Sequence, residues 1–420
     1  MSTLKNDLIS LAKGAQDAFR NALTVPSDIK DAALLDMSAA LLYSKAEIIR
    51  ANKKDLSAAR AAGRKGAFIE RLVLDEKRIK AMAASLDDIA ALPDPVDEVI
   101  SSVRRPNGLW IHKVRAPIGV IAIIYESRPN VTADCIGLCF KSGNAVILRG
   151  GSEARHSNLA IYNALRSVLK KYGLPEAMIS MVMTQDHKAV KELLKLNQYI
   201  DLAMPRGGES LIKAVVECSS VPVIKHYKGI CHVFVDEWAD LNMAQQICFN
   251  AKVQRPGVCN AMESMLVHRD VAARFLPAMI KQFKKAGVEI RGDVLTQKIG
   301  QRAVKKAREA DYRTEYLDLI LSVKVVNTLR DAIDHINEYG SHHSDSIVTD
   351  NYQNSLEFMR RVDSACVYTN ASTRFTDGGQ FGMGAEIGIS TDKLHARGPM
   401  ALEELTTYKY MVFGNGQVRQ

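Results

Sequence analysis

Residues 119–148 read GVIAIIYESRPNVTADCIGLCFKSGNAVIL, and their pattern sets the expected fold class. An unbroken apolar run at residues 120–125 and a second at residues 145–148 flank a stretch with helical character. Short, fully apolar strands that alternate with helices are typical of parallel strands buried on both faces. Candidate strands at residues 179–183, 200–204 and 221–225 continue this alternation. We therefore expect a parallel, doubly wound α/β sheet.

The alternation starts again further along the chain. A strand is expected at residues 232–236, a helix at 239–251, a strand at 262–267 and a helix at 272–286. Before the first sheet, residues 4–92 have apolar positions at helical spacing, and Pro93 and Pro95 end the last helix. Residues 108–116 alternate apolar and polar side chains behind a turn, as in one arm of an exposed hairpin. The sequence thus predicts two doubly wound parallel-sheet domains and a small β element.

Composition and charge argue against several classes of protein. The chain has 420 residues, 47% of them hydrophobic and 25% charged, which is ordinary for a globular protein with more than one packed unit. The longest strongly apolar run, residues 119–125, is too short for a membrane span, and residues 1–23 lack the apolar core of a secretory signal. The formal charge of +9 contains no run beyond two adjacent Lys or Arg. We expect no membrane or nucleic-acid partner, but a positive field that attracts small polyanions.

Seven cysteines are scattered without the paired spacings of a disulfide framework, which favours a reducing cytosol. Cys259 is set apart in the segment VQRPGVCN (residues 253–260), a loop between a predicted helix and a predicted strand. Arg255 nearby would favour a thiolate over a thiol. From these residues alone an inert, buried thiol is the commoner case, so both interpretations stay open.

Several separated motifs carry a resemblance to a known family. They are NAKVQRPGVCNAME (residues 250–263), YESRPNVT (125–132), MPRGG (204–208), HYKGICH (226–232), and a spaced pattern that runs from Val326 to Ile347. With these motifs in this order, the chain resembles the gamma-glutamyl phosphate reductase family, also called glutamate-5-semialdehyde dehydrogenases, of the aldehyde dehydrogenase superfamily. The resemblance covers nearly the whole chain and implies an aldehyde dehydrogenase-like fold.

The resemblance also implies a reaction, the NADPH-dependent reduction of L-glutamate 5-phosphate to L-glutamate 5-semialdehyde with release of phosphate, in L-proline biosynthesis. Cys259 aligns with the family's nucleophile and would form a thioester that a hydride then reduces. The Cys259 backbone N–H and a side-chain amide would stabilise the oxyanion, with Asn130 as our choice for the amide. Ser127 could hold that place instead, and Asn130 could equally be a helix N-cap.

A missing carboxylate favours reduction over oxidation. Aldehyde-oxidising relatives carry a Glu general base in a Glu-x-Gly-Gly-like segment, which activates the water that hydrolyses the thioester. Residues 225–229 read KHYKG at that place. Two alternatives remain: another NAD(P)-dependent, thioester-forming aldehyde dehydrogenase with a different acyl substrate, and a binding protein that has this fold without activity.

Two segments are candidates for the cofactor. Gly207 and Gly208 follow a strand and open a helix, which directs backbone N–H groups and a positive dipole end toward a pyrophosphate. The turn at residues 149–155 resembles the superfamily's adenosine-ribose segment and includes Ser152. Arg149 or Arg155 in that turn could pair with a 2'-phosphate and favour NADPH. The resemblance places Glu315 where relatives hold the nicotinamide ribose.

Three arginines, Arg128, Arg255 and Arg374, are candidates for the anionic groups of the substrate, and Arg374 in particular for its α-carboxylate, although a surface role for Arg374 is about as plausible. His342 and His343 have no carboxylate or Cys at ligand spacing, so we expect no metal.

The expected organisation is an NADPH-binding domain at residues 1–228, a catalytic domain at 229–395 and a C-terminal oligomerisation segment at 396–420, with the hairpin at 104–116 as part of the oligomerisation element. The active site would lie between the domains. We expect a cytoplasmic homodimer or homotetramer, to which a glutamate 5-kinase could channel the substrate.

Overall fold

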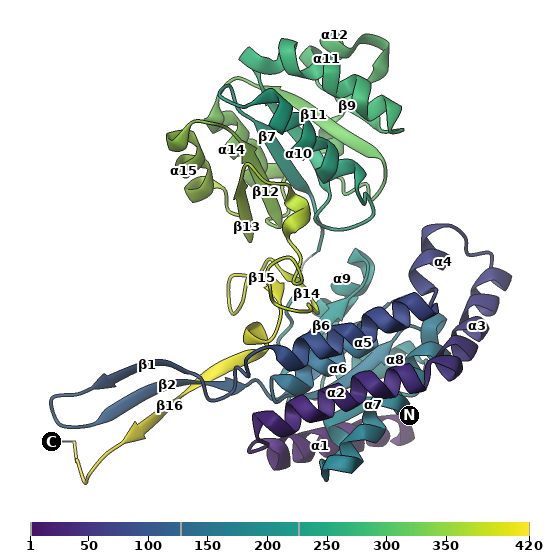
Figure 1. Cartoon of the computed structure of the whole chain (residues 1–420), viewed down its shortest axis with the longest axis vertical. Coiled ribbons are helices and arrows are strands. Elements are labelled where there is room, and N and C mark those ends of the chain that lie inside the picture. Colours follow the sequence, from purple (N-terminus) through teal and green to yellow (C-terminus); the bar gives the residue numbers. More distant parts are fainter. Residues whose placement is uncertain (1, 127, 226, 420) are drawn as a thin grey trace. The chain divides into compact units, whose positions relative to one another are not determined.

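The computed structural model describes residues 2–126, 128–225 and 227–419, and the chain forms two compact units (Figure 1). The first unit comprises Met1–Lys225, Gly382–Gly388 and Met400–Gln420, and the second comprises His226–Phe381 and Ile389–Pro399. The division falls at residue 225, close to the expected 228. Near the end of the chain the observed units differ from the expected domains, because residues 382–388 pack with the first unit. There the Glu386 Oε1 atom lies 3.9 Å from the Arg206 Nη2 atom.

The first unit begins with helices, as the apolar spacing predicts. They are α1 (Ser2–Ala22), α2 (Ser27–Tyr43), α3 (Lys45–Ala61), α4 (Ala67–Leu72) and α5 (Glu76–Ala91). Helix α5 ends two residues before Pro93, which cannot donate the next helical hydrogen bond. Because α2 packs against both α5 and α7, the N-terminal helices form part of the same packed unit as the sheet that follows.

A four-stranded parallel sheet lies in the first unit, with the strand order β5-β4-β3-β6. Its strands are β3 (Val120–Tyr125), β4 (Ala145–Gly150), β5 (Ile179–Met181) and β6 (Leu202–Arg206), and its helices are α6 (Asn130–Lys141), α7 (Arg155–Leu169), α8 (His187–Leu193) and α9 (Glu209–Cys218). Every residue of β3 is buried, as expected for a central strand covered on both faces. The carboxyl ends of these strands present the segments that were predicted to hold a cofactor.

The second unit contains a seven-stranded sheet with the order β10-β9-β11-β8-β7-β12-β13, in which all neighbouring strands are parallel. Its strands are β7 (Cys231–Val235), β8 (Met262–His268), β9 (Glu289–Gly292), β10 (Val304–Lys306), β11 (Ile320–Val326), β12 (Ser344–Val348) and β13 (Cys366–Thr369). Its helices are α10 (Leu241–Val253), α11 (Arg269–Lys285), α12 (Val294–Gly300), α13 (Glu309–Tyr312), α14 (Leu329–Tyr339) and α15 (Tyr352–Arg361). Val233 and Val235 face one hydrophobic core and Phe234 faces another, because successive strand residues point to opposite faces.

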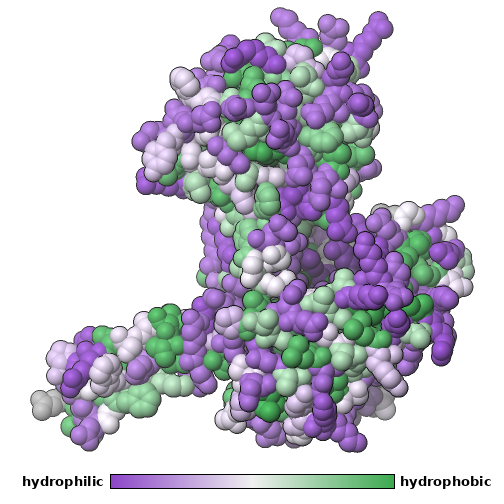
Figure 2. Space-filling model, viewed as in Figure 1, coloured by the Kyte–Doolittle hydropathy of each residue, from purple (hydrophilic) through white to green (hydrophobic). Residues whose placement is uncertain are grey.

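A small antiparallel sheet completes the first unit. It has the order β1-β2-β16, formed by β1 (Val99–Arg104), β2 (Trp110–Pro117) and β16 (Thr406–Phe413), and it extends away from the helices of that unit (Figure 1). The predicted hairpin is confirmed, and the C-terminal strand pairs with its second arm. Figure 2 shows hydrophobic residues along this sheet, and the exposed apolar side chains there include Val103, Val412 and Phe413. Two further short strands, β14 (Gly388–Ser390) and β15 (Gly398–Met400), pair with each other.

One predicted strand is wrong. Residues 221–225 form only an isolated bridge between Val223 and Ala203, beside β6. Pro222 lacks an N–H and so interrupts the ladder that a regular strand would need. In the described part of the chain, no helix has both the length and the apolar character that crossing a bilayer requires.

Candidate active site

Cys259 lies in the loop between α10 and β8, and its environment differs from that of most other thiols in the chain. Five of the seven cysteines are buried, and only Cys218 and Cys259 are partly exposed. Burial raises the pKa of the Cys135, Cys139, Cys231 and Cys248 thiols above the ordinary value. These four therefore stay protonated and inert, whereas Cys259 is accessible to a small reactant.

The backbone of Cys259 is held by Cys231, the first residue of β7, and by Gly229 just before that strand. The Cys231 thiol donates to the Cys259 carbonyl oxygen at 3.2 Å, and its raised pKa keeps that proton in place. Gly229 comes so close that a Cβ there would lie 2.0 Å from the same oxygen. Only glycine can be accommodated in this contact without moving the nucleophile's backbone.

The residue after the nucleophile is fixed by the segment that follows β13. The Asn260 amide donates to the Thr376 carbonyl at 2.7 Å, and the Thr373 hydroxyl donates to the Asn260 carbonyl at 2.7 Å. The Arg374 guanidinium donates to the Asn260 side-chain oxygen and, at 2.8 Å, to the Gln254 side-chain oxygen. Arg374 thus joins the two ends of the loop that carries Cys259.

Positive charge gathers around this loop. The pKa of the Arg374 guanidinium is lowered by its partial burial and then by the neighbouring positive charge of Arg255, while the Cys259 sulfur acts in the opposite direction. An arginine stays charged despite such a shift. Two guanidinium groups that repel each other beside a thiol form a site that an anion would stabilise. The structure therefore brings together three of the predicted site residues: Cys259, Arg255 and Arg374.

A buried ion pair that the sequence analysis missed lies next to the same loop. Lys252 at the end of α10 contacts Glu263 in β8 at 2.5 Å, and both side chains are almost fully buried. Glu263 also accepts the Leu317 N–H at 3.0 Å. Burial raises the pKa of Glu263 to about 7 and lowers that of Lys252, in each case against the attraction of the partner.

Glu315, predicted to hold the nicotinamide ribose, lies in the segment that Glu263 anchors. Its carboxylate accepts the Gly229 N–H at 2.9 Å. Because Gly229 also contacts the Cys259 carbonyl, a single glycine touches both the nucleophile's backbone and the Glu315 side chain. The second unit thus places Glu315 close to the Cys259 loop, which the sequence separation does not reveal.

In the first unit, Gly207 and Gly208 lie at the start of α9, as predicted. The Gly208 N–H donates to the Glu126 carboxylate at 2.9 Å, and a Cβ on Gly207 would lie 2.4 Å from that carboxylate. A carboxylate therefore occupies the kind of helix N-terminal position that binds phosphate. Glu126 was missed as a site residue; its signals in the sequence are its place directly after the apolar strand at 120–125 and its position in the motif YESRPNVT.

The turn after β4 separates its two arginines. Arg149 is only 6% exposed and donates to the backbone carbonyls of Gly150 and Gln185, at 3.1 and 3.2 Å. Arg155 is the exposed first residue of α7, and Ser152 is exposed as well. The arginine that is accessible to a solute is Arg155.

Asn130 is the exposed first residue of α6, and its amide donates to Asp134 at 3.3 Å. The N-cap of this helix is Pro129, so the interpretation of Asn130 as the N-cap is wrong. Arg128 is half-buried in the same segment, while Ser127 lies outside the described residues.

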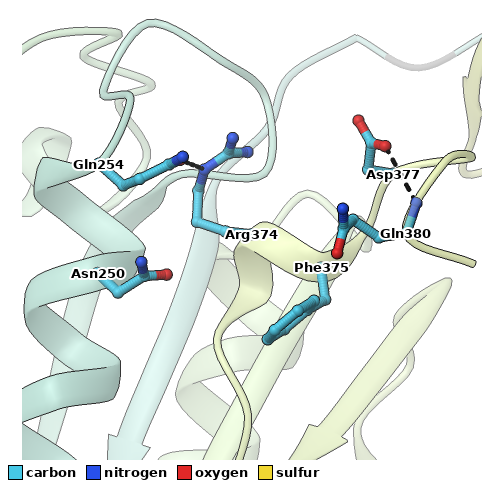
Figure 3. A pocket seen from close by; sticks show the side chains of 6 residues that line it. All are labelled: Asn250, Gln254, Arg374, Phe375, Asp377 and Gln380. Atoms are coloured by element: carbon cyan, nitrogen blue, oxygen red, sulfur yellow. Dashed lines mark hydrogen bonds between the residues drawn. The ribbon is translucent and has the colours of Figure 1, made fainter.

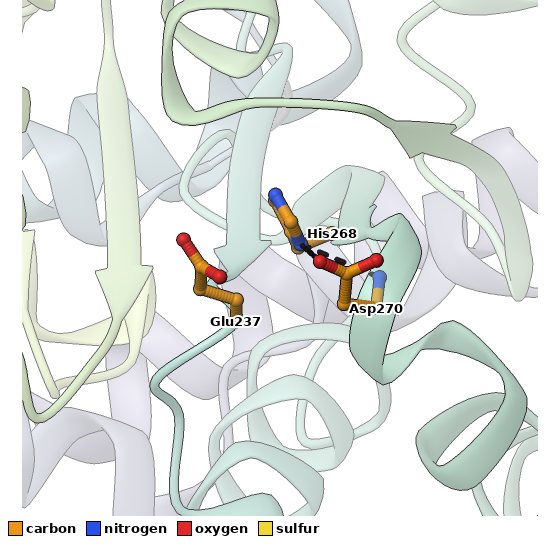
Figure 4. A group of neighbouring side chains, drawn as sticks. All are labelled: Glu237, His268 and Asp270. Atoms are coloured by element: carbon orange, nitrogen blue, oxygen red, sulfur yellow. Dashed lines mark hydrogen bonds and ion pairs between the residues drawn. The ribbon is translucent and has the colours of Figure 1, made fainter.

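The structure shows which neighbouring groups His342 and His343 contact. His342 contacts the Asp363 carbonyl at 2.5 Å, and His343 contacts the Ser344 hydroxyl at 2.9 Å. In the described part of the chain, Glu237, His268 and Asp270 have potential ligand atoms within 4.8 Å of one another (Figure 4). His268 already caps α11 by accepting the Asp270 N–H at 3.4 Å, and both carboxylates are exposed, so we assign no metal to this group.

Comparison with known proteins places these observations in context. Residues 5–318 match the aldehyde dehydrogenase family. The chain is 56% identical to the gamma-glutamyl phosphate reductase of Caldanaerobacter subterraneus subsp. tengcongensis over 409 residues, which are 97% of this chain and 99% of that protein. It is 53% identical to the gamma-glutamyl phosphate reductase of Geobacter metallireducens over 418 residues, which are 100% of both.

Solved structures agree with these relatives. The crystal structure of gamma-glutamyl phosphate reductase from Thermotoga maritima has a TM-score of 0.96 at 47% identity, and the match covers 98% of this chain and 100% of that one. An acetylating aldehyde dehydrogenase from Geobacillus thermoglucosidasius has a TM-score of 0.70 at 16% identity over 99% of this chain and 98% of that one. The second likeness concerns the fold alone.

Proposed function

The chain belongs to the aldehyde dehydrogenase family, and from that premise we propose that it is a gamma-glutamyl phosphate reductase. It would reduce L-glutamate 5-phosphate to L-glutamate 5-semialdehyde, with release of phosphate, in proline biosynthesis. Relatives of that name at 53–56% identity over nearly the full chain support this reaction. The observation that carries the chemistry is a partly exposed Cys259 beside two arginines, in a loop held at both ends.

Cys259 would act as the nucleophile. Its thiolate attacks the acyl carbon of the substrate, a carbon–sulfur bond forms, and the carbon–oxygen bond to phosphate breaks. The resulting thioester accepts a hydride at the same carbon, after which the carbon–sulfur bond breaks and the thiolate returns. NADPH, when bound, would supply that hydride. Negative charge develops on one oxygen in both steps, and we propose the Cys259 backbone N–H and the Asn130 amide as its donors.

The residues fit a dinucleotide phosphate. The Gly208 N–H at the start of α9 binds the Glu126 carboxylate, and Gly207 lets the backbone come so close to that anionic group that a Cβ would lie 2.4 Å from it. Of the two candidate arginines, the exposed Arg155 supports recognition of a 2'-phosphate better than the buried Arg149, so we assign the preference for NADPH to Arg155 with Ser152 beside it. Glu315 would hold the nicotinamide ribose.

Reduction is favoured over hydrolysis because residues 225–229, KHYKG, offer no carboxylate to activate water. Arg255 and Arg374 would bind anionic groups of the substrate, and Arg128 is a third candidate in the first unit. In this proposal the first unit carries the residues for the cofactor's phosphates, and the second carries the nucleophile and Glu315.

We further propose that the exposed apolar side chains on the β1-β2-β16 sheet mediate a homodimer or homotetramer. The seven free cysteines are consistent with a cytoplasmic location. A glutamate 5-kinase that delivers the labile acyl phosphate directly would be a compatible partner.

The reaction can be tested in reverse, with glutamate 5-semialdehyde, phosphate and NADP⁺. NADPH absorbance should rise with the unmodified protein, and this rise should be absent with Cys259→Ala. Cys218→Ala is the matched control, because Cys218 is the other partly exposed thiol and should be dispensable. Persistent activity in Cys259→Ala would remove this residue from the mechanism, and activity that does not require phosphate would favour a different acyl substrate.

A further inference from the structure

A pocket of about 270 Å³ lies beside Arg374 in the second unit (Figure 3). Its lining residues are Asn250, Gln254, Arg374, Phe375, Asp377 and Gln380. Pockets for small molecules are usually lined mainly by apolar side chains, but here five of the six are polar and two carry opposite charges. This lining suits a small, doubly charged solute better than an apolar one.

The pocket adjoins the nucleophile's loop. Gln254, at the beginning of this loop, lines the pocket, and Arg374 connects it to Asn260, the residue directly after Cys259. The charges of both Cys259 and Asp377 act on the Arg374 guanidinium. A ligand in this pocket would therefore lie beside the loop that carries Cys259. Arginine has five N–H donors, so its contacts with Gln254 and Asn260 leave it able to bind a carboxylate as well.

Asp377 brings a negative charge to the pocket that its structural role does not require. One carboxylate oxygen accepts the N–H groups of Gly379 and Gln380, at 3.0 and 3.3 Å, and so stabilises the turn that follows. An asparagine oxygen would serve that turn equally well. The charge itself is available to a cation in the pocket, because Asp377 is exposed.

We propose that this pocket binds the α-amino-acid end of the substrate, with Asp377 pairing with the α-ammonium group and Arg374 with the α-carboxylate. The inference rests on the proposed function and deepens it, because it names the residue that distinguishes an amino acid from a plain dicarboxylic acyl group. Three carbon–carbon bonds separate Cα of a glutamyl group from the reacting carbon. Its α-substituents must therefore be recognised close to Cys259, and this pocket adjoins the loop that carries Cys259.

The test compares two aldehydes in the reverse reaction with phosphate and NADP⁺. One is glutamate 5-semialdehyde, and the other is 5-oxopentanoate, which is the same chain without the α-ammonium group. The variant is Asp377→Asn, which keeps the turn acceptor and removes the charge. Because the amine of glutamate 5-semialdehyde also adds to its own aldehyde in solution, the measured quantity is the ratio of kcat/KM values between variant and unmodified enzyme.

Asp377→Asn should lower kcat/KM about tenfold or more for the amino aldehyde, the usual effect of losing a charged hydrogen-bond partner, and less than about twofold for 5-oxopentanoate. Inhibition constants for L-glutamate and glutarate should change in the same selective way, which covers the case of slow turnover of 5-oxopentanoate. Asp350→Asn, at an exposed carboxylate that does not line the pocket, should change neither ratio.

Two results would overturn the assignment of Asp377: equal losses for both aldehydes, which would indicate a role in the turn only, and no loss for either. Turnover by the unmodified enzyme without discrimination between the two aldehydes would refute recognition of the amine while leaving the reductase function intact. No turnover of either aldehyde would instead refute the proposed function.

Discussion

Replacing Lys252 with Met should make the stability of the second unit depend on pH in a new way. Lys252 and Glu263 are 0% and 1% exposed, so the variant leaves a buried carboxyl group without its cation. With Lys252 present, burial raises the pKa of Glu263 to about 7, and the attraction of Lys252 is the main factor that opposes this rise. Without Lys252 the pKa of Glu263 should rise further, into the range of 8 to 9 that is documented for buried glutamates.

The sign follows from proton binding. A carboxyl group whose pKa is higher in the folded state than in the unfolded state makes the protein lose stability as pH rises, up to the folded-state pKa. In the unmodified protein that loss through Glu263 ends near pH 7. In Lys252→Met it should continue at about 1.4 kcal/mol per pH unit, so the gap between the two proteins should widen by about 2 kcal/mol between pH 7 and 8.5. Near pH 6 the variant should be no less stable, since the desolvation cost of a buried lysine is gone.

The measurement is urea unfolding between pH 6 and 8.5, followed by tryptophan fluorescence. The chain has two tryptophans, Trp110 in the first unit and Trp238 in the second. A Trp110→Phe background therefore makes the signal report on the second unit. The double variant Lys252→Met/Glu263→Gln should lose the additional slope, because it has no titrating group at this place.

Two outcomes would refute this reasoning. Parallel pH profiles for Lys252→Met and the unmodified protein would show that Lys252 does not control the ionisation of Glu263. A loss that is largest below pH 7 would show that the sign is wrong, and with it the dominance of burial over attraction at this pair.

Two further substitutions test the contacts around the site. Gly229→Ala should lower the rate about 100-fold, because its Cβ would lie 2.0 Å from the Cys259 carbonyl oxygen and displace the nucleophile. The control for the initial rates is Gly14→Ala, whose Cβ would meet nothing closer than 4.0 Å. A fully active Gly229→Ala enzyme would contradict the close contact. Arg155→Ala should raise the KM for NADPH at least tenfold and leave the KM for NADH almost unchanged. If only Arg149→Ala has this selective effect, the 2'-phosphate is bound by the buried arginine instead.

The sheet architecture was predictable because its signal is local. The strand at residues 120–125 is apolar at every position, and the structure places it at the expected residues, buried throughout. The strand expected at residues 221–225 also looked apolar, but Pro222 at the edge of the sheet reduces it to one bridge. Periodicity shows which residues are apolar, but it does not show whether a neighbouring strand can complete the hydrogen bonds.

The site was predictable only where one residue carries the chemistry. Its loop set Cys259 apart, the family resemblance named it as the nucleophile, and the structure shows that it is one of the two cysteines that are not buried. The partners that hold the site come from distant parts of the chain, such as Glu126 at Gly208 and Gly229 at Glu315, and no local pattern connects them. Arg149 was an attractive phosphate ligand by position, but its side chain is buried and two of its N–H groups donate to backbone carbonyls.

The pairing of β16 with β2 has a consequence for how the protein is made. Pro117 is opposite Thr406, so the edge of β2 must wait until nearly the whole chain has left the ribosome. At the usual rates of translation that delay is on the order of 15 to 60 s. During this time a growing polypeptide carries an unpaired strand edge with apolar side chains, the kind of surface that recruits chaperones or identical nascent neighbours. A chain that terminates before β16 would make that transient state permanent.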